Sequence, residues 1–130
     1  MTDFAATMPF AVQLGIRITS ATPEEVIGEL DWVEERTTLG GALHGGALMS
    51  FADTVGAVCA FLNLPDGAAT STTSSSTVFL RGVRAGTVSA TAHPLHVGRS
   101  TIAITTQLRD DDGRMVAQVT QTQAVLNTKS

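Results

Sequence analysis

The chain has 130 residues, a length that fits one domain with one hydrophobic core. A hydrophobic share of 43% and a charged share of 15% exclude an intrinsically disordered chain. The net charge of −4 argues against nucleic acid as the main partner, and the single cysteine excludes an intrachain disulfide. The opening residues MTDFAATMPFAVQLG lack the basic start and long apolar run of a signal peptide, so we expect a cytoplasmic protein.

The first third of the chain predicts a short helix and two strands. Residues 3–12 are expected to form a short helix or turn around Pro9. Residues 14–19 and 26–33 alternate apolar and polar side chains, as half-buried strands do. Residues 34–43 are polar and contain glycines, which favours a loop.

Residues 44–62 (HGGALMSFADTVGAVCAFL) form the longest apolar stretch and predict a helix. A helix that is apolar nearly all round is normally buried inside its domain. Its apolar segment, residues 46–62, is slightly short for a membrane span, and Asp53 near its middle argues against one, so no membrane partner is expected. Cys59 lies mid-helix among apolar neighbours and is expected to be a buried small residue, not a nucleophile.

The second half of the chain predicts a succession of strands. Residues 63–68 have turn chemistry, and residues 110–113 (DDDG) supply a hairpin loop. The four expected strands are residues 71–80, 86–93, 100–109 and 115–126. Residues 71–80 could also be a low-complexity linker, but their threonines and valine favour a strand. The order predicts an α+β fold over residues 1–130, in which a curved antiparallel sheet wraps one central helix.

Two features of the long helix point to chemistry. Gly45 and Gly46 expose backbone N–H groups at the positive end of the helix dipole, where a developing oxyanion could bind. Asp53 could serve there as a base or nucleophile. The alternatives are ordinary turn chemistry for the glycines and a hydrogen-bonded structural carboxylate for Asp53.

The spacing of these features sets a geometric condition. Gly45 and Asp53 are eight residues apart, which is about 12 Å along one helix. A nucleophile and its oxyanion donors must converge within about 3 Å of the reacting atom. If both are catalytic, the protein must be at least a dimer, with each site built from two antiparallel helices.

The segment LHGGALMSFADTVGA at residues 43–57 resembles the core motif of hotdog-fold acyl-CoA thioesterases of the phenylacetate-pathway and 4-hydroxybenzoyl-CoA kinds. Residues 14–19, 79–101 and 108–126 resemble other strands of that family. The resemblance implies a hotdog fold, an acyl-CoA substrate, and dimers that often pair into tetramers. It implies no cofactor, because coenzyme A is part of the substrate.

The resemblance also implies roles for single residues. Gly45 matches the glycine whose N–H polarises the thioester carbonyl, with Gly46 beside it. Asp53 of the facing subunit matches the carboxylate that attacks the carbonyl or activates water. His44 matches a histidine that often lines the site, and it could equally cap the helix. Thr38 stands where relatives often have Asn or Gln to hold water or the carboxylate.

Other positions have less specific implied roles. Ala57 stands where relatives with a glutamate nucleophile have a threonine, and Ser71, Thr72 and Ser74 are candidates for holding the water. Arg81, Arg84 and Arg99, in a stretch without acids, match the region that contacts the phosphates of coenzyme A, although solvated strand ends are an equal alternative.

The remaining polar and aromatic residues give weaker indications. His93 and His96 flank Pro94 at a strand bend and are expected to be surface loop residues, with a contact to coenzyme A as the alternative. The histidines and the cysteine lack metal-ligand spacing, so no metal is expected. An aryl or medium-chain acyl group could lie in a groove formed by four apolar side chains, which could equally be plain core: Trp32, Leu48, Phe51 and Phe61.

Two other functions are compatible with the same fold. A hotdog hydratase or dehydratase uses an aspartate–histidine pair near the helix, but here the histidine precedes Asp53 by nine residues. A protein that binds acyl-CoA without turnover is the other alternative. We therefore expect a thioester hydrolase.

Overall fold

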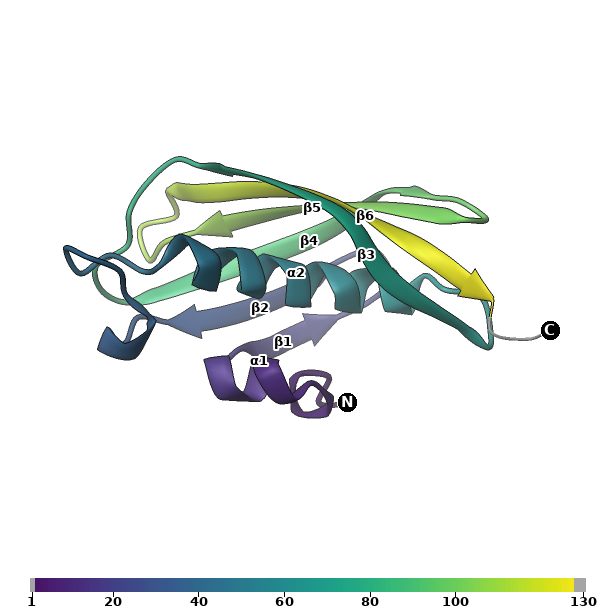
Figure 1. Cartoon of the computed structure of the whole chain (residues 1–130), viewed down its shortest axis with the longest axis horizontal. Helices are drawn as coiled ribbons and strands as arrows, with labels where there is room; N and C mark the ends of the chain where they lie inside the picture. Colours follow the sequence, from purple (N-terminus) through teal and green to yellow (C-terminus); the bar gives the residue numbers. More distant parts are fainter. Residues whose placement is uncertain (1, 128–130) are drawn as a thin grey trace.

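A computed structural model describes residues 2–127 of the chain (Figure 1). The helical elements are η1 (Ala5–Thr7), α1 (Pro9–Leu14), η2 (Glu34–Arg36) and α2 (Gly45–Leu62). The strands are β1 (Arg17–Ala21), β2 (Val26–Asp31), β3 (Ala68–Phe79), β4 (Thr87–Val97), β5 (Thr101–Arg109) and β6 (Met115–Asn127).

The six strands form one antiparallel sheet in the order β1-β2-β4-β5-β6-β3. The sheet curves around α2, which lies along its concave face (Figure 1). Buried side chains of α2, such as Phe51 and Val55, pack in one core with strand residues such as Ile104 and Val119. The predicted α+β fold with a wrapped central helix is confirmed.

The packing explains the apolar composition of α2. Its length and hydropathy would suffice for a membrane span. However, half of its residues are buried against the sheet, including Phe51, Val55, Val58 and Cys59. Burial in this core accounts for the hydropathy without a bilayer, as the sequence predicts for Cys59 and its neighbours.

The first strand begins later than the sequence predicts. Residues 14–19 are expected to form it, but Leu14 ends α1 and β1 begins at Arg17. Gly15 has a φ of 81°, a left-handed conformation that glycine adopts without steric cost and that commonly ends helices. Its N–H donates to the carbonyls of Ala11 and Val12. Alternation alone misses such a helix end, because Leu14 and Ile16 fit both periods.

The strand around Pro94 is longer than predicted. β4 continues from Thr87 through Pro94 to Val97, so His93 and His96 are exposed strand residues, not loop residues. Proline cannot donate to a strand ladder and is tolerated at irregularities. The register of β4 with β5 shifts between Pro94 and His96, which supplies such an irregularity.

β3 lies at one edge of the sheet and pairs only with β6. It is a strand, as its threonines and valine predict, and most of its side chains are exposed. The register shifts between Thr72 and Ser74, which marks a β-bulge. This bulge changes which side chains of β3 face α2, and it therefore matters for the site described next.

Candidate active site

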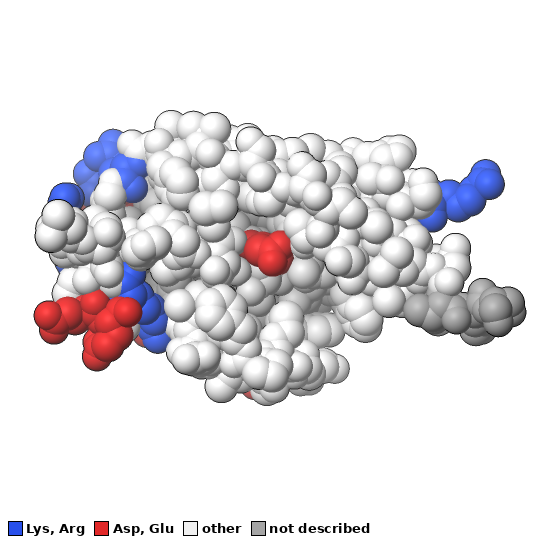
Figure 2. Space-filling view, viewed as in Figure 1, with Lys and Arg blue, Asp and Glu red and all other residues white. Residues whose placement is uncertain are grey.

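Asp53 is the only Asp, Glu, Lys or Arg in residues 37–65. It lies near the middle of α2 and is half-buried. Figure 2 shows one isolated acidic patch in the middle of the molecular face on which α2 lies, with uncharged atoms around it. An acidic side chain set in an uncharged surface is costly unless its oxygens have donors.

Two strands supply donors to Asp53. The hydroxyl of Thr72 on β3 donates to Oδ1 at 2.8 Å, and Nε2 of Gln121 on β6 donates to the same oxygen at 3.0 Å. Among residues 2–127, no hydrogen bond to Oδ2 is present. One carboxylate oxygen is therefore held by the protein, and the other remains available to a ligand.

The structure distinguishes the three hydroxyl residues that the sequence leaves open. All three residues are exposed, but only the Thr72 hydroxyl contacts Asp53, whereas the hydroxyls of Ser71 and Ser74 form no hydrogen bond within the described residues. The bulge is the physical reason. Counting back in twos from the inward-facing Thr77 would place Ser71 inward, but the extra residue at position 73 turns Thr72 inward instead.

A second glutamine extends the network. Nε2 of Gln123 donates to the Thr72 hydroxyl at 2.8 Å, and the Thr70 hydroxyl donates to Oε1 of Gln123 at 3.1 Å. Gln121 and Gln123 are each 1% exposed. Neither glutamine was among the site residues predicted from the sequence. A signal was present, because strict alternation along residues 115–126 places them on the same inward face as Val119 and Val125.

The amide of Gln121 fits a recess in the helix at Gly56. A β-carbon added at Gly56 would overlap the Gln121 amide, so glycine there is what leaves room for it. Oε1 of Gln121 is buried and has no hydrogen-bond partner within residues 2–127. A buried polar atom without a partner costs about 1–3 kcal/mol of stability. The Gln121 amide therefore destabilises the core relative to an apolar side chain of the same size.

The two glycines at the start of α2 differ in their backbone bonding. His44 is the N-cap residue, and its ring Nδ1 accepts the N–H of Gly46 at 2.8 Å. The N–H of Gly45 has no acceptor among residues 2–127. At the positive end of the helix dipole, Gly45 thus presents a free donor, while Gly46 is already paired.

The end of β3 lies next to this helix start. A β-carbon added at Gly45 would approach the Phe79 ring to 3.2 Å. Val78, Phe79 and Leu80 are all large, apolar and exposed. The free donor of Gly45 is therefore bordered by an exposed apolar patch at the end of an edge strand.

Thr38 lies in a turn before α2 and away from these contacts. Its N–H donates to the Ala42 carbonyl at 2.8 Å, and its carbonyl accepts the N–H of Gly41 at 3.1 Å. Its side chain is exposed and forms no hydrogen bond to any described residue. Within one subunit, the structure does not bring Thr38 into contact with Asp53 or Gly45.

The three arginines predicted to contact phosphates do not gather in one subunit. Arg81 and Arg84 precede β4 and Arg99 follows it, so the length of the strand, about 33 Å, separates them. Figure 2 shows cationic atoms at both ends of the molecule. The segment with Arg81 and Arg84 lies beside the start of α2, since the N–H of Leu43 donates to the Val83 carbonyl at 2.9 Å.

The four apolar side chains that could form a groove by sequence do not converge in the described part of the chain. Leu48 and Phe51 are core residues, and Trp32 is half-buried with its Nε1 donating to the Gly41 carbonyl at 2.9 Å. Phe61 is 54% exposed and faces a different surface, beside Phe4 and Met8. The four apolar side chains therefore lie in the core and on two separate surfaces, not along one groove.

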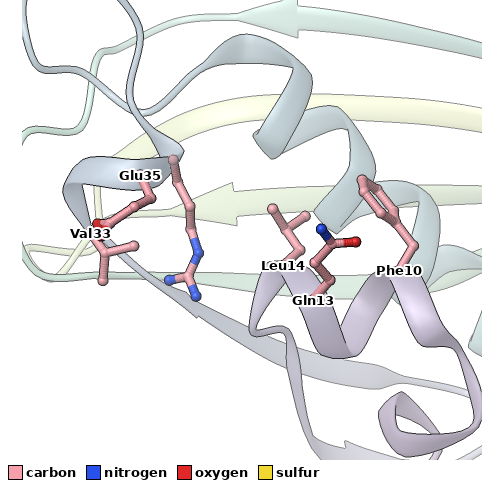
Figure 3. A pocket seen from close by; sticks show the side chains of 6 residues that line it. Phe10, Gln13, Leu14, Val33 and Glu35 are labelled. Carbon is pink, nitrogen blue, oxygen red and sulfur yellow. The ribbon is translucent and has the colours of Figure 1, made fainter.

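A groove of about 490 Å³ does lie between α1 and the segment around η2 (Figure 3). Its lining residues are Phe10, Gln13, Leu14, Val33, Glu35 and Arg36. An adjoining hollow shares Phe10, Leu14, Glu35 and Arg36 and extends to the start of α2, where it is lined by Thr37, His44, Gly46, Ala47 and Ser50. The groove therefore leads to the helix end that carries the free Gly45 donor.

Other reactive groups lie outside this arrangement. Cys59 is fully buried, and burial raises the pKa of its thiol to about 11, which leaves almost no thiolate at neutral pH. Within residues 2–127, no three His, Cys, Asp or Glu side chains converge as a metal site would require.

Comparisons with known proteins agree with this fold. Residues 40–117 match the sequence profile of the Thioesterase superfamily. A candidate esterase, ComA2 of Bacillus subtilis, is 34% identical over 116 residues, which cover 87% of this chain and 90% of the relative. A thioesterase structure from Haemophilus influenzae superposes with a TM-score of 0.89 at 25% identity, covering 93% of this chain and 85% of the other.

The E. coli PaaI protein, from the phenylacetic acid degradation operon, superposes with a TM-score of 0.85 at 25% identity, covering 93% of this chain and 86% of PaaI. The matched profile spans α2 with Asp53 and Gly45, and it reaches into β6. This chain is accordingly a hotdog-fold thioester hydrolase and belongs to the Thioesterase superfamily.

Proposed function

We propose that the chain hydrolyses an aryl or medium-chain acyl-CoA thioester to the free acid and coenzyme A. The observation that carries this proposal is Asp53. It is a lone carboxylate on an uncharged face, with Oδ1 held by Thr72 and Gln121 and Oδ2 without a partner among the described residues. A carboxylate in this state suits a base or nucleophile.

The proposed reaction uses two groups. The Gly45 N–H donates to the thioester oxygen and stabilises the negative charge that develops there. Oδ2 of Asp53 either attacks the carbonyl carbon or removes a proton from the water that attacks it. In the first route the carbon–sulfur bond breaks to leave an acyl–Asp53 anhydride, which water hydrolyses to the free acid and the Asp53 carboxylate. In the second route the water oxygen bonds to the carbonyl carbon as the carbon–sulfur bond breaks. In both routes a proton from that water ends on the sulfur, and coenzyme A leaves as its thiol.

These two groups must come from different subunits, because about 12 Å of helix separates Gly45 from Asp53 in one chain. We therefore propose at least a homodimer, in which two antiparallel copies of α2 build two sites, and in which dimers can pair further into tetramers. The free edge of β3 and the exposed Val78, Phe79 and Leu80 support this, since an apolar edge left in water invites pairing.

The proposed substrate path follows the surface around the start of α2. The acyl group lies in the groove beside Phe10 and Leu14, which adjoins His44 and Gly46. The phosphates of coenzyme A contact Arg81 and Arg84, whose segment is hydrogen-bonded to the loop before the helix. His44 holds the helix start in place by capping Gly46.

The test is Asp53→Asn assayed against a panel of aryl-CoA and aliphatic acyl-CoA thioesters. The substitution keeps the shape and removes the carboxylate, so kcat is expected to fall at least 100-fold on every substrate that the wild type turns over. Hydration of crotonyl-CoA is measured in parallel. Activity of Asp53→Asn within a few-fold of wild type would overturn the proposed mechanism.

The composite site is tested by mixing two inactive variants. Gly45→Pro removes the N–H, and proline is well tolerated at the first position of a helix. His44 already has the extended conformation that precedes proline, with a ψ of 134°. When Gly45→Pro and Asp53→Asn subunits are mixed, each mixed dimer contains one intact site, so about a quarter of wild-type activity returns. No recovery in demonstrably mixed dimers would show that sites form within one chain.

A further inference from the structure

We propose that Gln121 is a positioning residue that fixes the Asp53 carboxylate so that Oδ2 points at the thioester. This rests on the proposed function. Gln121 does not touch the substrate in this proposal. It acts through Asp53, and its position on β6 makes the last strand of the chain part of the active-site support.

The geometry of the carboxylate carries the first step. A single donor would leave the Asp53 carboxylate free to turn about its last side-chain bond. Two donors, Thr72 from β3 and Gln121 from β6, converge on Oδ1 at 2.8 and 3.0 Å. Because these donors come from paired strands, they fix both the oxygen and the plane of the carboxylate. Oδ2 is consequently the oxygen presented to a ligand.

The orientation of the amide carries the second step. A carboxylate only accepts hydrogen bonds, so the NH₂ end of Gln121 faces Asp53 and the carbonyl end faces the recess at Gly56. The side chain is 1% exposed and has no room to turn away. The amide is thus held as firmly as the carboxylate that it orients.

The unpartnered carbonyl carries the third step. If Gln121 served only to fill the core, an apolar side chain of the same size would avoid the buried carbonyl without a partner. Glycine at position 56, in the middle of a helix, is a second departure from what stability favours. Both departures serve one contact, the hydrogen bond to Asp53, which indicates that this contact has a function beyond folding.

The decisive variant is Gln121→Met, which keeps the side-chain length and removes both the donor and the orphan carbonyl. We expect an unchanged or higher Tm, a KM within twofold of wild type and a kcat about 10- to 100-fold lower, since a misplaced catalytic group costs about this much. A kcat within twofold of wild type would overturn the proposal. So would a kcat loss that accompanies a lower Tm, because a structural role predicts that pattern.

A matched control separates burial from positioning. Thr106 on β5 is also fully buried with an unpartnered hydroxyl, and it has no hydrogen bond to Asp53. Thr106→Val is expected to raise Tm and to leave kcat unchanged. If Thr106→Val lowered kcat as much as Gln121→Met, general repacking of the core would explain both, and the proposal would fail.

A second route displaces the amide without replacing it. Gly56→Ala places a methyl group where the Gln121 amide lies, so kcat should fall as it does in Gln121→Met. On a Gln121→Ala background, which leaves space for the methyl group, Gly56→Ala should lower kcat no further. If the kcat losses of Gly56→Ala and Gln121→Ala multiplied in the double variant, the two positions would not act through a shared contact.

Asp53→Asn in the same assay shows which proposal fails. An active Asp53→Asn overturns the proposed function, whereas an inactive Asp53→Asn beside a fully active Gln121→Met overturns only the role of Gln121.

Discussion

The two faces of α2 differ in what explains their residues. The side of α2 toward β2 carries Phe51, Val55 and Cys59, and packing alone accounts for them. The side toward β3 and β6 carries the Asp53 carboxylate and the recess at Gly56, and the start of the helix carries the free N–H of Gly45; a purely apolar core would need none of these three. One apolar helix therefore serves as core on one side and, in the proposed mechanism, carries the catalytic groups on the other. Substitutions on the two faces should consequently change different measurements.

The largest effect is expected at Phe51, on the core face. Phe51→Ala should lower the free energy of unfolding by about 3–5 kcal/mol, because a fully buried ring leaves a cavity. Urea denaturation measures this. If Phe51→Ala does not fold, Phe51→Leu should show a smaller loss in the same direction. The control is Leu39→Ala, at a position that is 99% exposed, where we expect a change of less than about 0.5 kcal/mol.

The next effect is expected at Gly45, on the chemical face. Gly45→Pro should lower kcat about 100- to 1000-fold by removing the oxyanion donor, while its free energy of unfolding changes little. Gly45→Ala keeps the N–H and only requires a small shift of the Phe79 ring, so its kcat should fall far less. Equal losses in the two variants would mean that space, and not the donor, matters at this position.

The sequence predicted the elements of both faces for simple reasons. The run of apolar residues at 44–62 requires a surrounding wrapper, and alternation in the later segments supplies one. Two local backbone irregularities could not be predicted from these sequence patterns. The left-handed Gly15 delays β1, and the irregularity after Pro94 lets β4 continue. Each is a single residue whose effect depends on its tertiary surroundings.

The hydrogen-bond donors to Asp53 could not be identified from the sequence for a related reason. The sequence offered Ser71, Thr72 and Ser74 equally, since a bulge that changes the parity of β3 leaves no trace in a run of serines and threonines. Gln121 was overlooked because a polar residue in a strand is normally assigned to solvent. The sequence also could not show which arginines lie together in space. The whole of β4 separates Arg99 from Arg81 and Arg84.

These arginines provide a third, smaller prediction about the chemical side. Arg81→Ala and Arg84→Ala should each raise KM for acyl-CoA about five- to tenfold, which corresponds to about 1–1.5 kcal/mol for a charge-assisted contact to phosphate. The same variants should leave KM unchanged for the N-acetylcysteamine thioester of the same acid, which has no phosphates. A rise in KM for both substrates would place these arginines near the acyl group instead.

The smallest effect is expected at the exposed Arg17–Asp31 pair, which joins β1 to β2. The Arg17 guanidinium, with Thr87 as a second donor, lowers the pKa of Asp31 from 3.8 to about 2. A lowered pKa stabilises the fold above pH 4 and loses that contribution as pH falls toward 2. Asp31→Asn should therefore cost less than about 1 kcal/mol at pH 7, because the pair is exposed.

Denaturation curves of wild type and Asp31→Asn should converge between pH 4 and pH 2, with kcat at pH 7 unchanged. A difference in stability that persisted at pH 2 would assign the effect to lost packing. A change in kcat would connect this surface pair to the active site, which the separation between core and chemical faces does not predict.

The absence of a side chain at Gly56 has a consequence for how this protein can vary. A methyl group at position 56 and an amide at position 121 cannot occupy the same volume, so we expect substitutions at the two positions to occur together. Descendants that gain alanine in the helix would need a shorter residue on β6 and another way to orient the carboxylate. Engineering that introduces alanine into α2 to raise helix propensity would meet the same constraint at this one position.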